Sequence, residues 1–367
     1  IKTGKGMMAN AYEVNIFIGG LQTYAEKELT SMVNNSGSID LDQLSYLISS
    51  KINGSETDKE KNDNKKLIYY SKELLKGKKN QIEITTYRAC NQTIKKLENY
   101  ENKYGRVLKF DDINLSFYRK FVALLESENY SVNSIGKHIK NLKIFLNDAL
   151  TNGITDNVIF KSRNFKVLRE TTTEIYLTNE EIQTLADKDF SNRPRIELAR
   201  DIFLIGCYTG QRVSDYNGLT NKNIEIKDGH KFIKINQKKT DTPVLMPITS
   251  AIQKVMSRYN NHFPPKLCEP ILRENIKTAC SNVGFKELKT VSQTKGGKLV
   301  KREVPKYNLC KTHTARRSFC TNHYIAGKPI QYIMLFSGHK TEREFLKYIR
   351  IEKDQEALAV LKSGFFD

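Results

Sequence analysis

The stretch that decides the fold lies near the C-terminus and reads Ser337-Gly338-His339-Lys340-Thr341-Glu342-Arg343-Glu344-Phe345-Leu346-Lys347-Tyr348. It places a tyrosine nine positions after a histidine. Upstream of it the chain reads His313-Thr314-Ala315-Arg316 and, earlier still, Thr209-Gly210-Gln211-Arg212-Val213-Ser214-Asp215. Arginines can neutralise charge on phosphate oxygens and a tyrosine can attack phosphorus, so these residue types indicate breakage and rejoining of a DNA backbone through a phosphotyrosine.

The composition is strongly basic. Among 367 residues, 60 are Lys or Arg and 41 are Asp or Glu, which gives a formal net charge of +19. An excess of this size favours a polyanionic partner and salt-sensitive binding to phosphates. A soluble protein whose charge only prevents self-association would have the same composition, so the net charge alone does not identify the chemistry. The length allows two or three domains.

The six cysteines are scattered without a CxxC pair, and the remaining histidines show no metal-ligand spacing. This pattern fits neither a zinc site nor a small disulfide scaffold, so we expect reduced thiols, no metal and a cytoplasmic protein. No signal peptide and no apolar stretch long enough to cross a bilayer is evident, and we expect no membrane role. Because the chain begins with Ile1, we expect a segment to be missing upstream.

Residues 1–78 form the first expected zone, an N-terminal helical segment followed by a polar linker. A helix is expected from about Glu13 to Val33. The segment Lys51–Lys66 is charged and free of aromatic residues, as is typical of a flexible linker. A connecting helix is expected to begin at Leu67.

Residues 79–170 form the second expected zone, which is helical. Apolar residues at three- and four-residue steps predict helices over about Thr85–Tyr104 and Leu115–Glu128, and a third that follows Ser131 and ends near Gly153. The face of the third helix opposite its apolar residues shows Lys137, His138, Lys140 and Lys143. Such a face is either a solvated surface or a DNA-binding one.

Residues 171–350 form the third expected zone. Thr178 and Glu181 predict a capping box at a helix start, and Gly210 should end the apolar helix Ile196–Tyr208, so that Arg212 begins the next helix. Alternating residues predict a β-hairpin with its turn at residues 238–242. A second, Lys-rich hairpin is expected over Lys289–Lys301, and a helix capped by Thr312 or Thr314 should carry His313 and Arg316 on one face.

The order and spacing of these motifs resemble those of the tyrosine recombinases (phage-type integrases). The resemblance covers about 80–350 in organisation and 175–350 in motifs. Three positions depart from the usual pattern of that family: Gln211 replaces a leucine, Asp215 a glutamate and Ser337 a leucine. The departure at Gln211 concerns local packing rather than Arg212.

The resemblance implies a multidomain fold that clamps DNA. Residues 79–170 would be an all-α, SAM-like core-binding domain. Residues 171–350 would be a mixed α/β catalytic domain, mainly α with small antiparallel sheets. The tail 351–367 would dock on a neighbouring protomer, although it could equally fold back on its own domain.

The resemblance also assigns roles to single residues. Tyr348 would be the nucleophile, with the catalytic set completed by Arg212, Lys239, His313, Arg316 and His339. Asp215 would orient Arg212 or close its turn. Lys239 would act as general acid from the hairpin turn, with Lys238 as the alternative. The expected DNA contacts are Lys137, Lys140, Lys143 and Lys238.

The function implied is site-specific recombination through a 3′-phosphotyrosine, without metal, ATP or another cofactor, for integration or excision of a mobile element. The closest resemblance is to integrases of conjugative or mobilisable transposons. Implied partners are double-stranded DNA at attachment or inverted-repeat sites, accessory DNA-bending or excision factors, and three further copies of the chain on synapsed DNA, with a monomer when free. The implied location is the bacterial nucleoid. A type IB topoisomerase and a catalytically silent DNA-binding regulator remain as alternatives.

Overall fold

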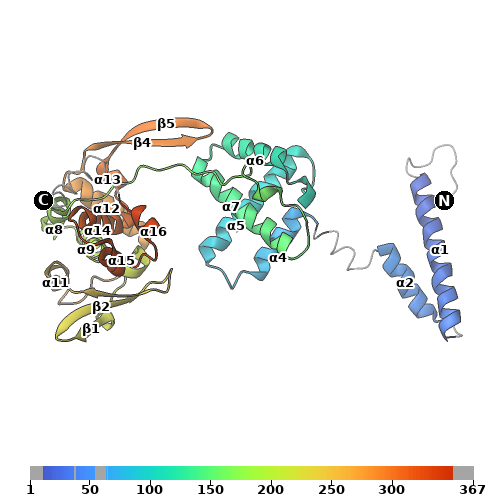
Figure 1. The fold of residues 1–367 in the computed structure, drawn as a ribbon, viewed down its shortest axis with the longest axis horizontal. Helices are drawn as coiled ribbons and strands as arrows, with labels where there is room; N and C mark the ends of the chain where they lie inside the picture. Colours follow the sequence, from blue (N-terminus) through green and yellow to red (C-terminus); the bar gives the residue numbers. More distant parts are fainter. Residues whose placement is uncertain (1–10, 37–38, 54–62, 64, 350–367) are drawn as a thin grey trace. The chain divides into compact units, whose positions relative to one another are not determined.

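The computed structural model describes residues 11–36, 39–53, 63 and 65–349. The chain divides into two compact units, each with its own hydrophobic core (Figure 1). The first unit takes in residues 1–170 together with 294–298, and the second takes in residues 171–293 and 299–367. The expected tail 351–367, and the part of the expected linker at 54–62 and 64, lie outside the described residues.

Helices make up the first unit. They are α1 (Ala11–Ser36), α2 (Leu41–Asn53), α4 (Leu67–Gly77), α5 (Ile84–Tyr104), the short 3₁₀ helix η1 (Phe110–Asp112), α6 (Leu115–Ser127), α7 (Val132–Thr151) and η2 (Ile159–Lys161). The three helices predicted between 85 and 153 are therefore confirmed within one or two residues at most ends. Gly105 ends α5 in the left-handed conformation (φ 63°), and the Ser131 hydroxyl caps α7 by accepting from the Ser134 amide.

Helix α4 differs from the expectation of a connecting helix. Its buried side chains Leu67, Ile68 and Leu75 belong to the same hydrophobic cluster as Leu97 of α5 and Leu142 of α7. The Tyr70 hydroxyl also donates to the Asp148 carboxylate of α7 at 2.7 Å. Helix α4 is thus part of the core of the helical unit.

His138 of α7 does not lie on the exposed basic face that the sequence suggested. It is buried, its Nδ1 lies 2.9 Å from the Thr93 hydroxyl, and its ring packs edge-on against Tyr130. Burial lowers its pKa to about 4, with the charges of Lys96 and Lys137 acting in the same direction. His138 is therefore a neutral core residue at pH 7.

The second unit combines helices with two small antiparallel sheets. Its helices are α8 (Asn179–Asp187), α9 (Pro194–Thr209), α10 (Val213–Tyr216), η3 (Asn221–Asn223), α11 (Ser250–Ser257), α12 (Glu269–Asn282), α13 (Lys306–Leu309), α14 (Thr312–Ile325), α15 (Ile330–Ser337) and α16 (Glu342–Leu346). Its strands are β1 (Ile224–Lys227), β2 (His230–Asn236), β3 (Pro243–Pro247), β4 (Leu288–Lys295) and β5 (Lys298–Pro305).

Both predicted hairpins are present. Strands β2 and β3 pair with each other, and Ile233 lies opposite Met246. Strand β1 pairs with β2 as a third strand, which was not predicted from the sequence. Strands β4 and β5 form the second sheet, and Gly296 and Gly297 both take positive φ in its turn. The tip of this second hairpin belongs to the first unit.

Helix α9 is the centre of the second unit. It is buried nearly all round, with Ile202, Phe203, Leu204 and Ile205 in the core, and it packs against α12 and α14. The predicted capping box is confirmed at α8, where Thr178 and Glu181 bond reciprocally. Gly210 ends α9 in the left-handed conformation (φ 67°), so the chain turns sharply and presents Arg212 as the N-cap residue of α10.

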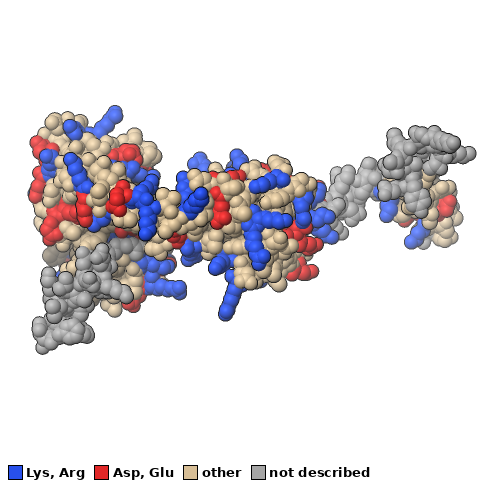
Figure 2. All heavy atoms as spheres, turned by 90° about the horizontal axis from the view of Figure 1, so that it is seen from above, with Lys and Arg blue, Asp and Glu red and all other residues tan. Residues whose placement is uncertain are grey.

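The basic charge is spread over the surface rather than held by one element. On the face that Figure 2 shows, Lys and Arg side chains occur on both units, with Asp and Glu side chains among them. Within the described part of the chain, no helix is long and apolar enough to cross a membrane.

Candidate active site

Tyr348 lies at the centre of a cluster of motif residues in the second unit. Its ring centroid is 5.2 Å from that of His313 and 4.5 Å from that of His339, and the Arg316 guanidinium carbon lies 5.4 Å from it. The Tyr348 backbone is fixed by its own amide, which donates to the Phe345 carbonyl at 2.8 Å. The structure therefore brings together four of the six residues predicted to be catalytic.

Arg316 is completely buried on α14. Its Nη1 donates to the carbonyl oxygens of Gly210 (2.9 Å) and Ser337 (2.6 Å), and its Nη2 lies 3.1 Å from His339 Nε2. Since a guanidinium can only donate, His339 Nε2 accepts, and Nδ1 carries the hydrogen that it gives to the Ser337 hydroxyl at 2.7 Å. Both side chains are thereby held in one orientation.

The N-cap of α14 corrects one expectation. The cap residue is Lys311, not Thr312 or Thr314; the Thr314 hydroxyl instead accepts from the Lys311 amide at 3.0 Å. His313 and Arg316 still fall on one face in the first turns. Arg317, the next residue on α14, pairs with Glu174 at 2.6 Å.

Both site histidines are neutral at pH 7. Burial lowers the pKa of His313 to about 4, with Arg317 and Arg316 adding to the effect. Burial likewise lowers the pKa of His339 to about 3, with Arg316, Arg212 and His313 adding to it. A neutral imidazole can accept a proton, and the pKa would rise when a phosphate anion neutralised the nearby arginines.

Arg212 is held by a partner that the sequence reading missed. Its Nη1 donates to the side-chain oxygen of Gln237, the residue after β2, at 2.7 Å. Asp215 was expected to orient Arg212 or to close its turn. Its amide donates to the Arg212 carbonyl at 2.8 Å, and its Oδ1 accepts from the Lys238 amide at 3.1 Å and from the Ser214 hydroxyl. Asp215 thus joins α10 to the hairpin backbone.

Lys239 lies in the turn between β2 and β3, as predicted. A cavity of about 520 Å³ opens there, and Lys238 and Lys239 are both exposed at it. The cavity lining consists of Arg212, Lys238, Lys239, Thr240, Asp241, Gly338, His339, Lys340 and Glu344. One cavity thus gathers three predicted catalytic residues from separate parts of the chain, with four basic side chains around a space that can admit a phosphate.

The predicted DNA contacts of α7 differ in their surroundings. Lys137 and Lys140 are exposed. Lys143 is half-buried, its Nζ lies over the Phe165 ring at 5.5 Å from the centroid, and desolvation lowers its pKa. Lys137 and Lys140 are therefore better placed than Lys143 to reach an external phosphate.

The position of Gln237 in the sequence could have identified it as a candidate site residue. In a strand, residues two apart share a face, and Ile233 and Ile235 are buried on one side of β2. Gln237 continues this buried series although it is polar. A polar side chain at an inward strand position must find partners, which makes it a candidate for a role in a site.

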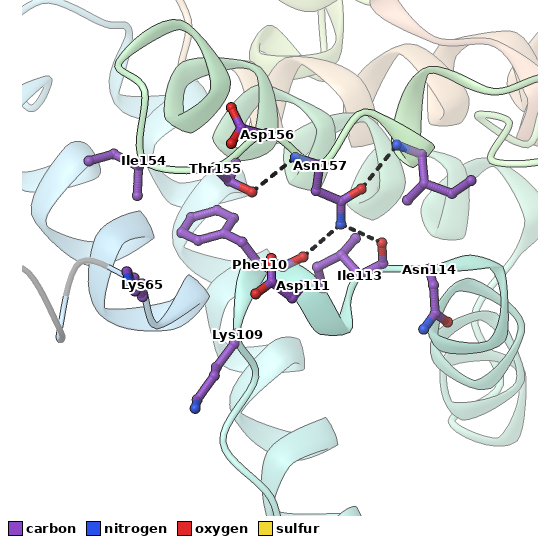
Figure 3. Close-up of a pocket in the computed structure, with 11 residues that line it drawn as sticks. Lys65, Lys109, Phe110, Asp111, Ile113, Asn114, Ile154, Thr155, Asp156 and Asn157 are labelled. Carbon is purple, nitrogen blue, oxygen red and sulfur yellow. Dashed lines mark hydrogen bonds between the residues drawn. The ribbon is translucent and has the colours of Figure 1, made fainter.

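A second, larger cavity lies in the first unit (Figure 3). It has a volume of about 670 Å³, and the Asn157 side chain holds part of its wall by donating to the carbonyl oxygens of Phe110 (2.7 Å) and Ile113 (2.8 Å). Its charged lining residues carry both signs, namely Lys65, Lys109, Asp111 and Asp156. None of the predicted catalytic residues lines it, so size alone does not identify the active site here.

The lowered histidine pKa values predict acid-sensitive stability. The unfolded chain binds protons on these histidines below about pH 6.5. The folded chain resists protonation until about pH 4 at His313 and His138 and about pH 3 at His339. Their contribution is therefore full above pH 6.5 and is lost as pH falls towards these folded values. We expect thermal unfolding at a clearly lower temperature at pH 5 than at pH 7.5, with each histidine contributing about 2 kcal/mol to the difference.

The variants His313→Asn and His339→Asn should flatten this pH dependence in thermal melts. The exposed His230 provides the control, and His230→Asn should leave the profile unchanged. Equal pH dependence in all three variants would contradict the assignment of the effect to the buried imidazoles.

Comparisons with known proteins agree with the fold and with the motifs. A model of the phage integrase SAM-like domain matches residues 66–167, and a model of the phage integrase family matches residues 175–355. No curated protein matches the chain at a significant level.

Three similar solved structures illustrate the fold. The Tn1549 transposon integrase in complex with a circular intermediate DNA is 15% identical with a TM-score of 0.60, over 81% of this chain and 99% of that one. A lambda integrase tetramer bound to a Holliday junction is 16% identical with a TM-score of 0.57, over 90% and 89%. The XerH site-specific recombinase bound to a palindromic difH substrate is 14% identical with a TM-score of 0.52, over 93% and 95%.

These comparisons confirm the predicted fold class, an all-α core-binding domain joined to a mixed α/β catalytic domain. Together the two family models extend over most of residues 66–355, which includes every motif quoted above. The chain belongs to the phage integrase family of tyrosine recombinases, enzymes of site-specific DNA recombination.

Proposed function

We propose that the chain cuts and rejoins DNA with Tyr348 as its nucleophile, in order to integrate or excise a mobile element. The observation that carries the proposal is the position of Tyr348 between His313 and His339 and next to Arg316. A tyrosine that merely filled the core would not need two neutral imidazoles and a buried guanidinium around its ring.

In the proposed first step the Tyr348 oxygen attacks the scissile phosphorus in line. A bond forms between the phenolic oxygen and phosphorus, and the bond from phosphorus to the 5′-oxygen breaks, leaving a 3′-phosphotyrosine. His313 takes the phenolic proton, because its imidazole is neutral and its ring contacts that of Tyr348. Lys239 protonates the leaving 5′-oxygen.

The arginines stabilise the charge that gathers on the non-bridging oxygens. Arg212 lines the cavity and uses one nitrogen for Gln237, which leaves other donors of its planar fork for phosphate. Arg316, whose guanidinium is hydrogen-bonded to His339, adds its positive charge from the buried side of the site. A 5′-hydroxyl of a second duplex then attacks the phosphotyrosine, so the energy of the broken bond is conserved.

The proposal has four further parts. Four protomers act together through a Holliday junction, and the reaction serves a mobile element. Accessory DNA-bending factors take part, and the protein is located at the nucleoid. The support is the similarity of the chain to a transposon integrase and to an integrase tetramer on such a junction. Lys137, Lys140 and Lys238 would contact backbone phosphates, and so would Lys143 once its side chain left Phe165.

The test uses duplexes built from the ends of the element that encodes the chain, with a nick next to the scissile phosphate so that cleavage is trapped. We expect SDS-resistant protein–DNA adducts, and resolution of a synthetic Holliday junction with the same arms. Relaxation of plasmids without junction resolution would indicate a type IB topoisomerase. Binding to these duplexes without any adduct would indicate a silent DNA-binding protein.

A further inference from the structure

Gln237 makes an unusually complete set of contacts for a buried amide. Its side-chain oxygen accepts from Arg212 Nη1 (2.7 Å) and from the Thr240 hydroxyl (2.8 Å). Its side-chain nitrogen donates to the side-chain oxygen of Gln211 (2.7 Å) and to the Ser337 carbonyl (2.9 Å). All four hydrogen-bonding positions of the amide are therefore used.

The orientation of this amide is fixed by its partners. The guanidinium of Arg212 can only donate, so the atom facing it must be the oxygen of Gln237. The Ser337 carbonyl can only accept, so the atom facing it must be the nitrogen. A flipped amide would lose both contacts.

Gln211 extends the connection on the other side. Its side-chain nitrogen donates to the carbonyl oxygens of Phe336 (2.6 Å) and Thr209 (3.1 Å), while its oxygen accepts from Gln237. Both glutamines are completely buried. The pair thus joins the turn after α9, the hairpin after β2 and the end of α15.

The Ser337 carbonyl connects this pair to the remainder of the site. It accepts from Gln237 and also from Arg316 Nη1, at 2.6 Å. Gly338 permits the approach: a β-carbon at this position would lie 2.5 Å from the Gln237 amide nitrogen, and its φ is +69°. His339 follows directly, and its ring hydrogen-bonds the Ser337 hydroxyl.

We infer that Gln237, supported by Gln211, is a positioning residue that sets both site arginines and the Lys239 turn in one fixed geometry. It contacts Arg212 directly, reaches Arg316 through the shared Ser337 carbonyl, and holds the residue next to Lys239 through Thr240. Displacement of a phosphate clamp by as little as 1 Å is costly for catalysis, so this amide affects the chemical step rather than DNA binding.

The same contacts explain why glutamine suits position 211. Leucine, the residue that the resemblance led us to expect there, would leave one amide hydrogen of Gln237 and the Phe336 carbonyl without these bonds. Gln211 and Gln237 are therefore a matched pair.

The inference rests on the proposed function and is tested with the full chain on the nicked duplexes described above. Gln237→Met keeps the length of the side chain but removes its hydrogen bonds. We expect single-turnover cleavage to slow about 10²-fold, with DNA affinity changed less than about threefold, because the oriented charges act mainly in the transition state.

A second substrate separates positioning from general damage to the fold. A methylphosphonate at the scissile position lacks one of the charged oxygens that the arginines neutralise. On this substrate we expect Gln237→Met to be slower than the unchanged chain by less than about fivefold. An equal loss on both substrates, or cleavage of the phosphodiester at the unchanged rate, would overturn the inference.

Gln211→Met guards against poor folding of the first variant. We expect its cleavage rate to fall about tenfold. The double variant should cleave no more slowly than Gln237→Met, because the effects of two residues that act through one shared contact are not additive. Fully additive losses would contradict a matched pair.

The control is Ser71→Ala, in which a buried hydroxyl loses its bond to the Leu67 carbonyl at 2.7 Å. Ser71 lies in the first unit, outside the glutamine network, and cleavage should keep its rate. Failure of the unchanged chain to form any adduct would refute the proposed function itself, a result distinct from all of these.

Discussion

Replacement of Tyr348 by phenylalanine should abolish the covalent protein–DNA adduct. The ring would still pack between His313 and His339, so the fold and DNA binding should survive, whereas the attacking oxygen would be gone. We expect adduct formation on nicked duplexes to fall by at least about 10⁴-fold, as for removal of other covalent nucleophiles. Gel-shift affinity should stay within about threefold, because the phenolic oxygen is a small part of a large phosphate-dominated interface.

Tyr332 provides the matched control for this experiment. It lies in the same C-terminal region on α15, is 62% exposed, and Tyr332→Phe should form adducts as the unchanged chain does. Adducts that persist in Tyr348→Phe would show that another residue attacks the phosphate.

Replacement of Arg316 by lysine should give the second-largest loss. Lysine keeps the charge but cannot bond the carbonyl oxygens of Gly210 and Ser337 while also facing His339. We expect cleavage to slow about 10³-fold, the upper range for loss of a preorganised donor to a developing charge.

Some of that loss could reflect stability, because Arg316 is completely buried. Arg200 separates the two effects: it is equally buried and bonds the carbonyl oxygens of Ala186 and Lys188 at the end of α8. Arg200→Lys should lower the melting temperature comparably, yet its folded fraction should cleave at the unchanged rate. Equal catalytic losses per folded molecule would contradict the role of Arg316.

The features predicted well from the sequence are those set by local rules. Gly210 ends α9 because a glycine adopts positive φ readily, and this fixes where Arg212 stands. The capping box at Thr178 and the alternation in β2 and β3 are also properties of short segments. The motif spacing then sufficed to group His313 with Tyr348.

The features that were missed depend on contacts between distant segments. The partner of Arg212 is Gln237, on another element, whereas the sequence suggested the nearby Asp215. His138 is next to lysines in the sequence, but the orientation of α7 in the core places its side chain against Thr93. The periodicity of apolar residues predicts which face of a helix is buried. For a residue at the boundary between the two faces, tertiary packing determines whether its side chain is buried.

The most direct test of the central claim is to identify the atom that carries the DNA. Trapped adducts formed in the presence of EDTA would be digested with trypsin and nuclease, and the modified peptide sequenced by mass spectrometry. We expect a nucleotide joined through its 3′-phosphate to Tyr348, with a 5′-hydroxyl freed on the cleaved strand. Attachment to another residue, or through a 5′-phosphate, would contradict the account.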